Sequence, residues 1–294
     1  MPAFLFISGY LSKNVVSHRM KDLETLLYPF VIFQIVYILF YVVGTAGTFR
    51  FNLFAPVYLT WYLVTLFFCR LFLPYLRMIN TKTCLVVLFL MAIVSGFYVD
   101  NGFLAFYRTL YFLPVFYIGF KWNDIEESVA KLYKFKYLLM ALLFVLCVVV
   151  FLASSYSMDY YSRIRLCIST DHNYSGSSLV ALGKICGYFL SFIMMTSFFL
   201  ITHIIDKKNE KVNVFFEQVG RHSMSVYTLH GFFVLGTIPF FSRYLPLWLN
   251  IITSITMSLL LCYVFSRKKV VHVFKFAFDF KELKRLIVIK QIAR

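Results

Sequence analysis

A histidine inside an apolar stretch is the residue of this sequence best suited to proton transfer. In the stretch 223–240, Ser223, Tyr227 and His230 stand at positions i, i+4 and i+7, so an α-helix would carry all three side chains on one face. An imidazole placed there can act as a general base, because histidine exchanges protons near neutral pH. The alternative interpretation is a histidine that is buried and hydrogen-bonded for packing. The sequence leaves both interpretations open.

Two arginines also lie within apolar stretches. A charged side chain near the centre of a bilayer costs about 2.5–3.5 kcal/mol on insertion scales, so it usually faces the interior of a helix bundle or water. Arg70, near one end of the stretch 54–73, either binds an anionic ligand or extends its guanidinium to the membrane surface. Arg108, in the stretch 106–120, either holds an acceptor molecule or lies at the level of the lipid headgroups.

Other polar groups carry a weaker signal. Lys184, Tyr188 and Ser191 repeat the i, i+4, i+7 spacing in another apolar stretch. Asp171 and His172 resemble an acid–base pair, but adjacency in the chain does not bring two side chains to one site. The sequence has no phosphate-binding glycine loop, zinc-protease motif or nucleophile elbow, and its six cysteines form no CxxC pair. We therefore expect no bound metal and no disulfide framework.

The elements that must position these residues are apolar stretches of nearly membrane-spanning length. A spanning helix needs about 20 mostly apolar residues, and fewer where neighbouring helices or a thinner bilayer help. Eight stretches approach this length, and a shorter one precedes them. The nine predicted spans are 2–12, 24–43, 54–73, 84–99, 106–120, 137–155, 179–202, 223–240 and 245–265.

The composition agrees with a membrane protein. Hydrophobic residues make up 61% of the 294 residues and charged residues 14%, and phenylalanine alone occurs 36 times. A soluble domain of this length could not cover so much apolar surface. We therefore predict an all-α polytopic membrane protein with about nine transmembrane helices. The expected location is the cell membrane, as a multi-pass protein of a bacterial plasma membrane.

Lysine and arginine alternate in density along the chain. They cluster after the first, third, fifth, seventh and ninth predicted spans and thin out after the others. Because cytoplasmic loops carry the excess of basic residues, this pattern predicts a cytoplasmic C-terminus. Topology and attraction to anionic lipid also account for the formal net charge of +16, so membrane lipid is an expected partner and nucleic acid is not. The clusters are Lys13–Lys21, Arg77–Lys82, Lys121–Lys136, Lys207–Arg221 and Arg267–Arg294.

The same pattern divides the chain into two regions. Residues 1–265 form the predicted membrane domain. Residues 266–294 form a basic cytoplasmic tail, whose mixture of basic and apolar residues is typical of a helix lying in the membrane interface. Between the spans, the outer segment 156–178 is polar and aromatic, and the inner segment 203–222 is charged and amphipathic.

Four segments of the sequence resemble one family in the same order. They are MPAFLFISGYLSK at the start, APVYLTWYLVTLFFCRLF from Ala55, YRTLYFLPVFYIGF from Tyr107 and GRHSMSVYTLH from Gly220. Each segment alone is low in information, whereas four in order are fairly specific. Together they resemble the membrane acyltransferase 3 family and, within it, the fucose 4-O-acetylase-like proteins.

This resemblance implies a fold and an activity. The family is a bundle of ten helices that transfers an acyl group, usually acetyl from cytoplasmic acetyl-CoA, to a glycan or lipid-linked glycan. An inner rim with Arg70, Arg77 and Lys82 would suit the phosphates of CoA, and the outer segment 156–178 would suit a sugar. The residues implied for catalysis are His230, Tyr227 and Arg108.

The sequence departs from the family at its start. The family's first helix carries a basic residue followed some turns later by a histidine, and this sequence opens after that helix. We expect the upstream DNA to encode an apolar stretch of about 20 residues with this pair, in an intact or a broken frame. A broken frame would make the product an inactive acyltransferase remnant.

A second function, from another class, is also open. Flippases and polymerases of polysaccharide biosynthesis are likewise aromatic-rich, basic on the inner side and multi-spanning. Loss of O-acetyl groups on gene deletion would favour the acyltransferase, whereas loss of the whole polymer would favour a flippase or polymerase.

Overall fold

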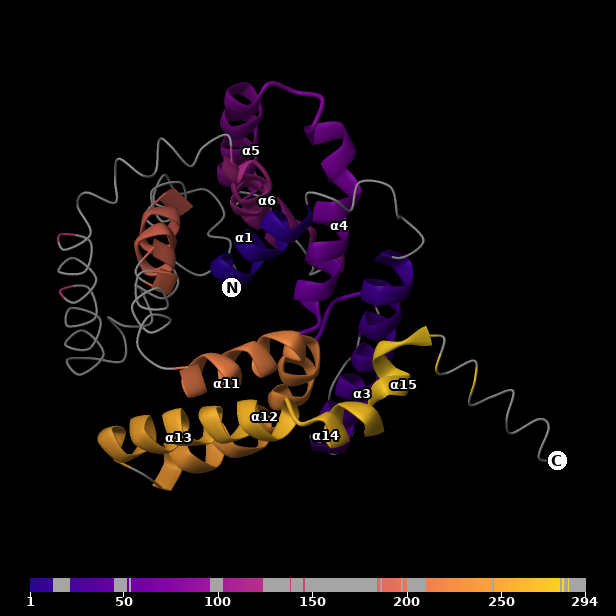
Figure 1. Cartoon of the computed structure of the whole chain (residues 1–294), viewed down its shortest axis with the longest axis vertical. Helices are drawn as coiled ribbons and strands as arrows, with labels where there is room; N and C mark the ends of the chain where they lie inside the picture. The colour runs from indigo at the N-terminus through magenta and orange to yellow at the C-terminus, as the bar shows by residue number, and fades with distance from the viewer. Residues whose placement is uncertain are drawn as a thin grey trace. The chain divides into compact units, whose positions relative to one another are not determined.

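The computed structural model of the protein is helical, with no strand among the residues that it describes (Figure 1). The chain divides into two compact units. The first unit consists of Met1–His18 and Phe68–Lys207, and the second of Arg19–Phe67 and Lys208–Arg294. The described residues are 1–12, 22–44, 52, 54–95, 103–123, 138, 145, 184–185, 187–196, 198–199, 210–244, 246–280, 282 and 285.

The first unit is a group of apolar helices. Its elements are α1 (Pro2–Leu11), the later turns of α4 (Trp61–Leu76), α5 (Thr81–Ser95), the 3₁₀ turn η3 (Phe103–Ala105), α6 (Phe106–Phe120) and the helical segment Gly187–Thr196. α6 packs against both α1 and α5. Its entry is strained, because Leu104 and Ala105 have φ of 49° and 48°, a region that non-glycine residues rarely adopt.

α1 and α6 cross at two glycines, each of which faces the backbone of the other helix. A Cβ built on Gly9 would lie 2.0 Å from the carbonyl oxygen of Phe116, and one built on Gly119 would lie 2.0 Å from the carbonyl oxygen of Phe6. A side chain fits at neither place, so both glycines are needed for this close approach. Small residues at such crossings are typical of helix association in membranes, where close packing takes the place of the hydrophobic effect.

Phe6 connects three helical segments of the first unit. Its side chain is 7% exposed and packs with Val115 of α6 and Met195 of the segment Gly187–Thr196. The edge of its ring also meets Trp122, with ring centroids 5.1 Å apart. The apolar face of α1 is therefore buried within this unit.

The second unit contains a helical hairpin and a C-terminal segment that returns to α3. Its elements are η2 (Leu23–Leu27), α3 (Tyr28–Gly44), the first turns of α4, α11 (Glu210–Arg221), α12 (Ser223–Tyr244), α13 (Leu247–Phe265), α14 (Lys268–Val273) and α15 (Lys275–Phe278). α12 and α13 pack against each other, and α15 packs against α3 (Figure 1). The Tyr28 hydroxyl donates a hydrogen bond of 2.5 Å to the carbonyl oxygen of Phe276, which anchors this return.

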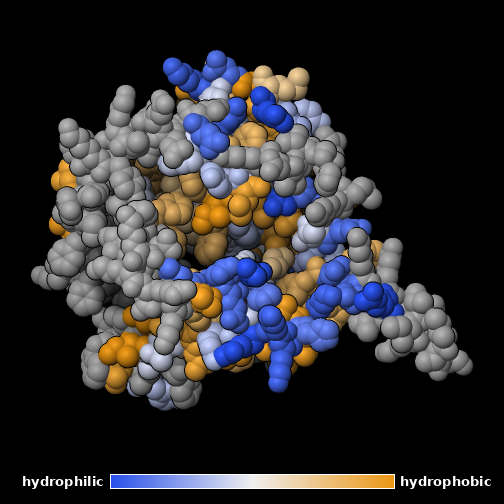
Figure 2. Space-filling model, viewed as in Figure 1, coloured by the Kyte–Doolittle hydropathy of each residue, from blue (hydrophilic) through white to orange (hydrophobic). Residues whose placement is uncertain are grey.

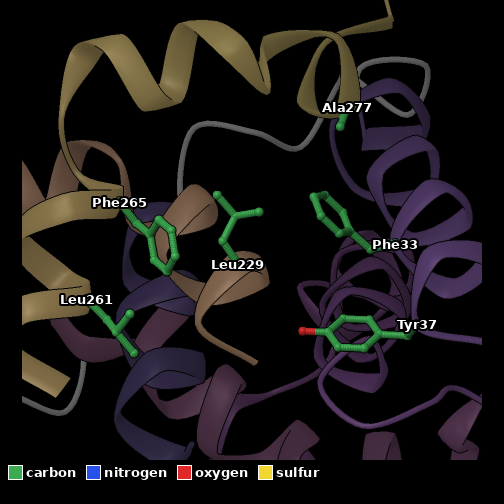
Figure 3. Close-up of a cluster of buried hydrophobic side chains, with 6 residues drawn as sticks. All are labelled: Phe33, Tyr37, Leu229, Leu261, Phe265 and Ala277. Carbon is green, nitrogen blue, oxygen red and sulfur yellow. The ribbon is translucent and has the colours of Figure 1, made fainter. Parts of the chain in front are cut away.

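The core of the second unit joins its first helices to its last. α3, α12, α13 and α15 all contribute to one buried cluster (Figure 3). Tyr37 lies at its edge with no exposed surface, and its ring stacks on that of Phe232 at 4.2 Å between centroids. The buried members are Phe33, Tyr37, Leu229, Leu261, Phe265 and Ala277.

An amide inside α3 holds the turn that leads into α4. The Gln34 side chain is 1% exposed; its Nε2 donates to the carbonyl oxygen of Ala55 at 2.7 Å. Its Oε1 accepts bonds from the Val57 amide at 2.9 Å and the Thr60 hydroxyl at 2.7 Å. This buried polar group is therefore fully used, as its removal from water requires.

The same turn corrects one predicted boundary. The apolar run predicts a helix over 54–73, but α4 begins at Trp61, and the described residues among 54–60 form turns and extended backbone. Tyr58 has φ of 51° there, which a helix does not allow. Hydropathy alone could not reveal this, because the bonds that hold the turn come from Gln34 in another helix.

Among the described residues, two helices are long and apolar enough to cross a membrane, Leu23–Gly44 and Phe103–Phe120. The all-helical class is confirmed for this part of the chain, whereas the number of spans and the cytoplasmic C-terminus stay predictions. The predicted span 137–155 lies outside the described residues apart from two of its positions, and 179–202 is described in part. The shorter apolar helices are Pro2–Leu11, Trp61–Leu76, Thr81–Ser95, Gly187–Thr196 and Ile252–Phe265.

Candidate functional site

His230 lies in α12, half-buried, with a defined hydrogen bond. Its Nδ1 is 2.9 Å from the carbonyl oxygen of Val226, one turn earlier. A carbonyl oxygen only accepts, so Nδ1 of the neutral ring must carry the proton and Nε2 must carry the lone pair. This tautomer leaves Nε2 as the atom that can accept a proton from a substrate.

Tyr227 lies beside His230 and is held by the turn before α4. The two ring centroids are 6.0 Å apart, as their spacing on one helix predicts. The Tyr227 hydroxyl donates to the carbonyl oxygen of Leu59 at 2.6 Å, and its ring packs on that of Tyr62 at 5.2 Å. This bond connects α12 to the turn that Gln34 holds.

Tyr37 supplies a second anchor for α12. Its hydroxyl donates to the carbonyl oxygen of Thr228 at 2.8 Å, and Figure 3 shows this hydroxyl pointing away from α3. The approach depends on Gly231, where a Cβ would lie 2.1 Å from the Tyr37 hydroxyl oxygen. The turn of helix that carries His230 is therefore fixed in position by hydrogen bonds from Tyr37 and Tyr227.

The sequence analysis did not single out Tyr37, Gln34 or Gly231. A signal was present for one of them, since Gln34 is an amide inside an otherwise apolar stretch and would be costly there without partners. The role of Gly231 depends on a contact with α3, far away in the chain, so the sequence gave no indication of it.

Arg108 lies in the first turn of α6, in the other unit. Its Nε donates to the hydroxyl oxygen of Tyr107 at 2.9 Å, and its guanidinium carbon lies 5.6 Å from the centre of that ring. The side chain is half-buried, just after the strained turn at Leu104 and Ala105. This position suits a guanidinium that meets a ligand at the end of a helix.

Arg70, Arg77 and Lys82 lie along one corner of the first unit. Arg70 is half-buried in α4, whereas Arg77, in the turn after α4, and Lys82, in the first turn of α5, are exposed. Asn80 begins α5, because its side-chain oxygen accepts a bond from the Lys82 amide at 3.1 Å and its carbonyl accepts one from the Cys84 amide at 2.8 Å. The corner is therefore a defined turn that presents two exposed cations.

The weaker group around Lys184 is partly brought together. Lys184 is 4% exposed, and its ammonium lies 5.1 Å from the ring centre of Tyr111 in α6. Tyr188 stacks on the same ring at 4.5 Å and donates a hydrogen bond to the Tyr111 carbonyl oxygen. A buried ammonium over an aromatic face is stabilised by a cation–π interaction, which gives Lys184 a packing role in this unit. Asp171 and His172 lie outside the described residues.

Metal chemistry has no visible basis in the described part of the chain. Within it, no group of three or more histidine, cysteine, aspartate or glutamate side chains could hold a metal ion. The described cysteines Cys69, Cys84 and Cys262 are free thiols.

Helices of this composition, with an anchored histidine inside one of them, define a helical membrane protein that can accept a proton in an apolar setting. The sequence model of a family described as an acyltransferase domain matches residues 1–267. The chain therefore belongs to this family, the acyltransferase 3 family of membrane acyltransferases. Comparison with curated proteins gave no match, and comparison with solved structures gave none either.

Proposed function

We propose that the protein is an integral-membrane O-acetyltransferase that transfers acetyl from cytoplasmic CoA to a hydroxyl of a surface or capsular glycan, or of its lipid-linked precursor. The observation that carries the proposal is the family match over residues 1–267. The resemblance of four segments to fucose 4-O-acetylase-like proteins supports a sugar acceptor. The alternation of basic residues supports a cytoplasmic C-terminus and nine spans in this chain.

The donor binds at the cytoplasmic rim in this proposal. CoA is a polyanion, and Arg70, Arg77 and Lys82 would hold its phosphates. Arg77 and Lys82 are exposed at a fixed corner between α4 and α5, which suits capture of a ligand from water. CoA cannot cross lipid, so the acetyl group must pass through the protein to reach a glycan on the outer side.

The transfer itself needs one proton acceptor. Nε2 of His230 takes the proton of the acceptor hydroxyl while the hydroxyl oxygen attacks the thioester carbonyl carbon. The new C–O bond forms, the C–S bond breaks, and the CoA thiolate leaves and takes up the proton from the imidazolium. Tyr227 is a positioning residue, since its hydroxyl is engaged by Leu59, and Arg108 would bind acceptor oxygens.

The test compares two histidine variants at the chromosomal locus. His230→Ala should lower glycan O-acetylation about 10²–10⁴-fold, the usual contribution of a general base, while the protein still accumulates in the membrane. His272→Ala, in α14 and exposed, removes an imidazole elsewhere and should leave acetylation unchanged. O-acetyl groups are measured by proton NMR of the purified polysaccharide.

Two results would overturn the proposal. Wild-type acetylation in the His230→Ala strain would return this residue to a packing role. Loss of the whole polymer on gene deletion, rather than of its O-acetyl groups, would identify a flippase or polymerase instead.

A further inference from the structure

A basic pocket lies in the second unit, away from the donor corner and from His230. Its volume is about 810 Å³, and it is formed where the last turns of α11 face the junction of α13 and α14. Polar and charged side chains make up nearly all of its lining. The lining residues are Val214, Glu217, Gln218, Arg221, His222, Arg267, Lys268 and Lys269.

A side-chain bond holds the two walls of this pocket together. The Gln218 Nε2 donates to the carbonyl oxygen of Ser266 at 3.1 Å, which ties α11 to the end of α13. Ser266 is 1% exposed and its hydroxyl donates to the carbonyl oxygen of Tyr263 at 3.1 Å, so the bonded carbonyl is itself fixed. The pocket is therefore built by the fold rather than by loose surface side chains.

The charge inside the pocket is strongly positive. Four permanent cations, Arg221 and Arg267–Lys269, share it with one carboxylate, that of Glu217. Glu217 pairs with Arg221 at 2.5 Å, but these side chains are 59% and 73% exposed, so water screens the pair. The excess cations would favour a ligand that carries a phosphate.

The pocket lies at the boundary between an apolar helix and charged surface. Arg267 follows the apolar helix Ile252–Phe265 almost directly, and its guanidinium carbon is 3.9 Å from the ring centre of Tyr263. On the other wall, Val214 lines the pocket and Phe216 of the same helix is 53% exposed. Figure 2 shows hydrophilic residues gathered over α11 and α14, beside hydrophobic residues of the α12–α13 hairpin. Tyrosine and arginine at the end of an apolar helix are typical of headgroup depth.

We infer that this pocket binds the phosphate headgroup of an anionic phospholipid in the inner leaflet. A lipid is favoured over a soluble phosphate compound because apolar residues flank the cations on both walls, where acyl chains could continue. The inference does not depend on acyl transfer, so binding can fail or succeed whatever the activity of the protein.

The test counts bound phosphatidylglycerol on the purified full chain in detergent by native mass spectrometry as the lipid is titrated. Each pocket cation should contribute about fivefold to affinity, so Arg267→Gln should weaken binding about fivefold and the Arg267→Gln, Lys268→Gln pair about 30-fold. Arg285→Gln removes an exposed cation outside the pocket and should change nothing. Phosphatidylcholine, which has no net charge, should bind weakly to all forms.

A second variant makes the test independent of folding defects. Glu217→Gln removes the only carboxylate of the pocket and should tighten phosphatidylglycerol binding about fivefold, a gain that a misfolded protein would not show. Glu282→Gln, outside the pocket, is its control. Equal losses in Arg267→Gln and Arg285→Gln would overturn the inference in favour of diffuse attraction. Displacement of the lipid by 3′,5′-ADP would overturn it in favour of a nucleotide site.

Discussion

The crossing of α1 and α6 allows a prediction with a worked magnitude. In Gly119→Ala the new Cβ would lie 2.0 Å from the Phe6 carbonyl oxygen and 2.8 Å from its carbon. Both are backbone atoms, so no rotamer change relieves the contact, and the helices must separate until the gap exceeds 3.0 Å. The variant therefore opens the interface by about one ångström along its length.

The loss follows from the packing of Phe6. A buried side chain makes about 40–60 contacts of about 0.1–0.2 kcal/mol each, and a gap of about 0.5–1 Å forfeits a quarter to a half of each contact. Over the half of Phe6 that faces α6 the loss is about 1–2 kcal/mol, and the neighbouring Val115 and Ile118 raise it to about 2–4 kcal/mol. Alanine also gains about 1 kcal/mol in helix propensity over glycine, which a control must remove.

Gly236→Ala in α12 is that control, because a Cβ there meets no heavy atom within 4 Å. It gains the same propensity without a clash, so the two variants should differ in unfolding free energy by about 2–4 kcal/mol. Cys84, 1% exposed on α5, reports unfolding through its reaction with a fluorescent maleimide when it is the sole cysteine. Equal stability of the two variants would refute the reasoning, since it would show that α1 and α6 do not approach this closely.

Three further predictions concern the turn before α4, the anchor of α12 and the topology. Gln34→Leu leaves the Ala55 carbonyl and the Val57 amide without their partner, so maleimide-detected unfolding should show a loss of about 2–6 kcal/mol; a loss below 1 kcal/mol would mean that water replaces the amide. Tyr227→Phe removes only the bond to Leu59 and should cost about 1 kcal/mol, with glycan acetylation reduced less than in the histidine variant. In intact cells, a membrane-impermeant thiol reagent should label a cysteine introduced at position 177 and not one at position 209; the reverse pattern would invert the predicted orientation.

Hydropathy predicted the helices well where the chain itself decides the boundary. The predicted spans 2–12, 24–43 and 106–120 match α1, η2 with α3, and α6 within two residues. The span 54–73 is displaced, because the turn before Trp61 depends on hydrogen bonds from α3. The span 84–99 begins earlier, at Thr81, because Asn80 caps the helix; side-chain capping is invisible to an apolar count.

The candidate site was predictable only at the level of one helix. The spacing of Tyr227 and His230 already places both on one face of α12, since this is local geometry. The anchors of that helix, Leu59 and Tyr37, come from distant parts of the chain, and no periodicity reveals them. The cations of the pocket at Arg267 entered the sequence analysis as topology signals only, because their assembly depends on α11 meeting the end of α13.

The core of the second unit also sets an order of events during synthesis. Phe33 and Tyr37 in α3 are made early, whereas Ala277, which completes their cluster, lies in α15. At about 5–20 residues per second, α3 waits about 12–50 s for this partner. The unit therefore passes most of its synthesis with one face of α3 uncovered, and a polypeptide halted before α15 would keep that face open. Surveillance proteases that test nascent membrane proteins would thus have a specific marker of incompleteness to detect.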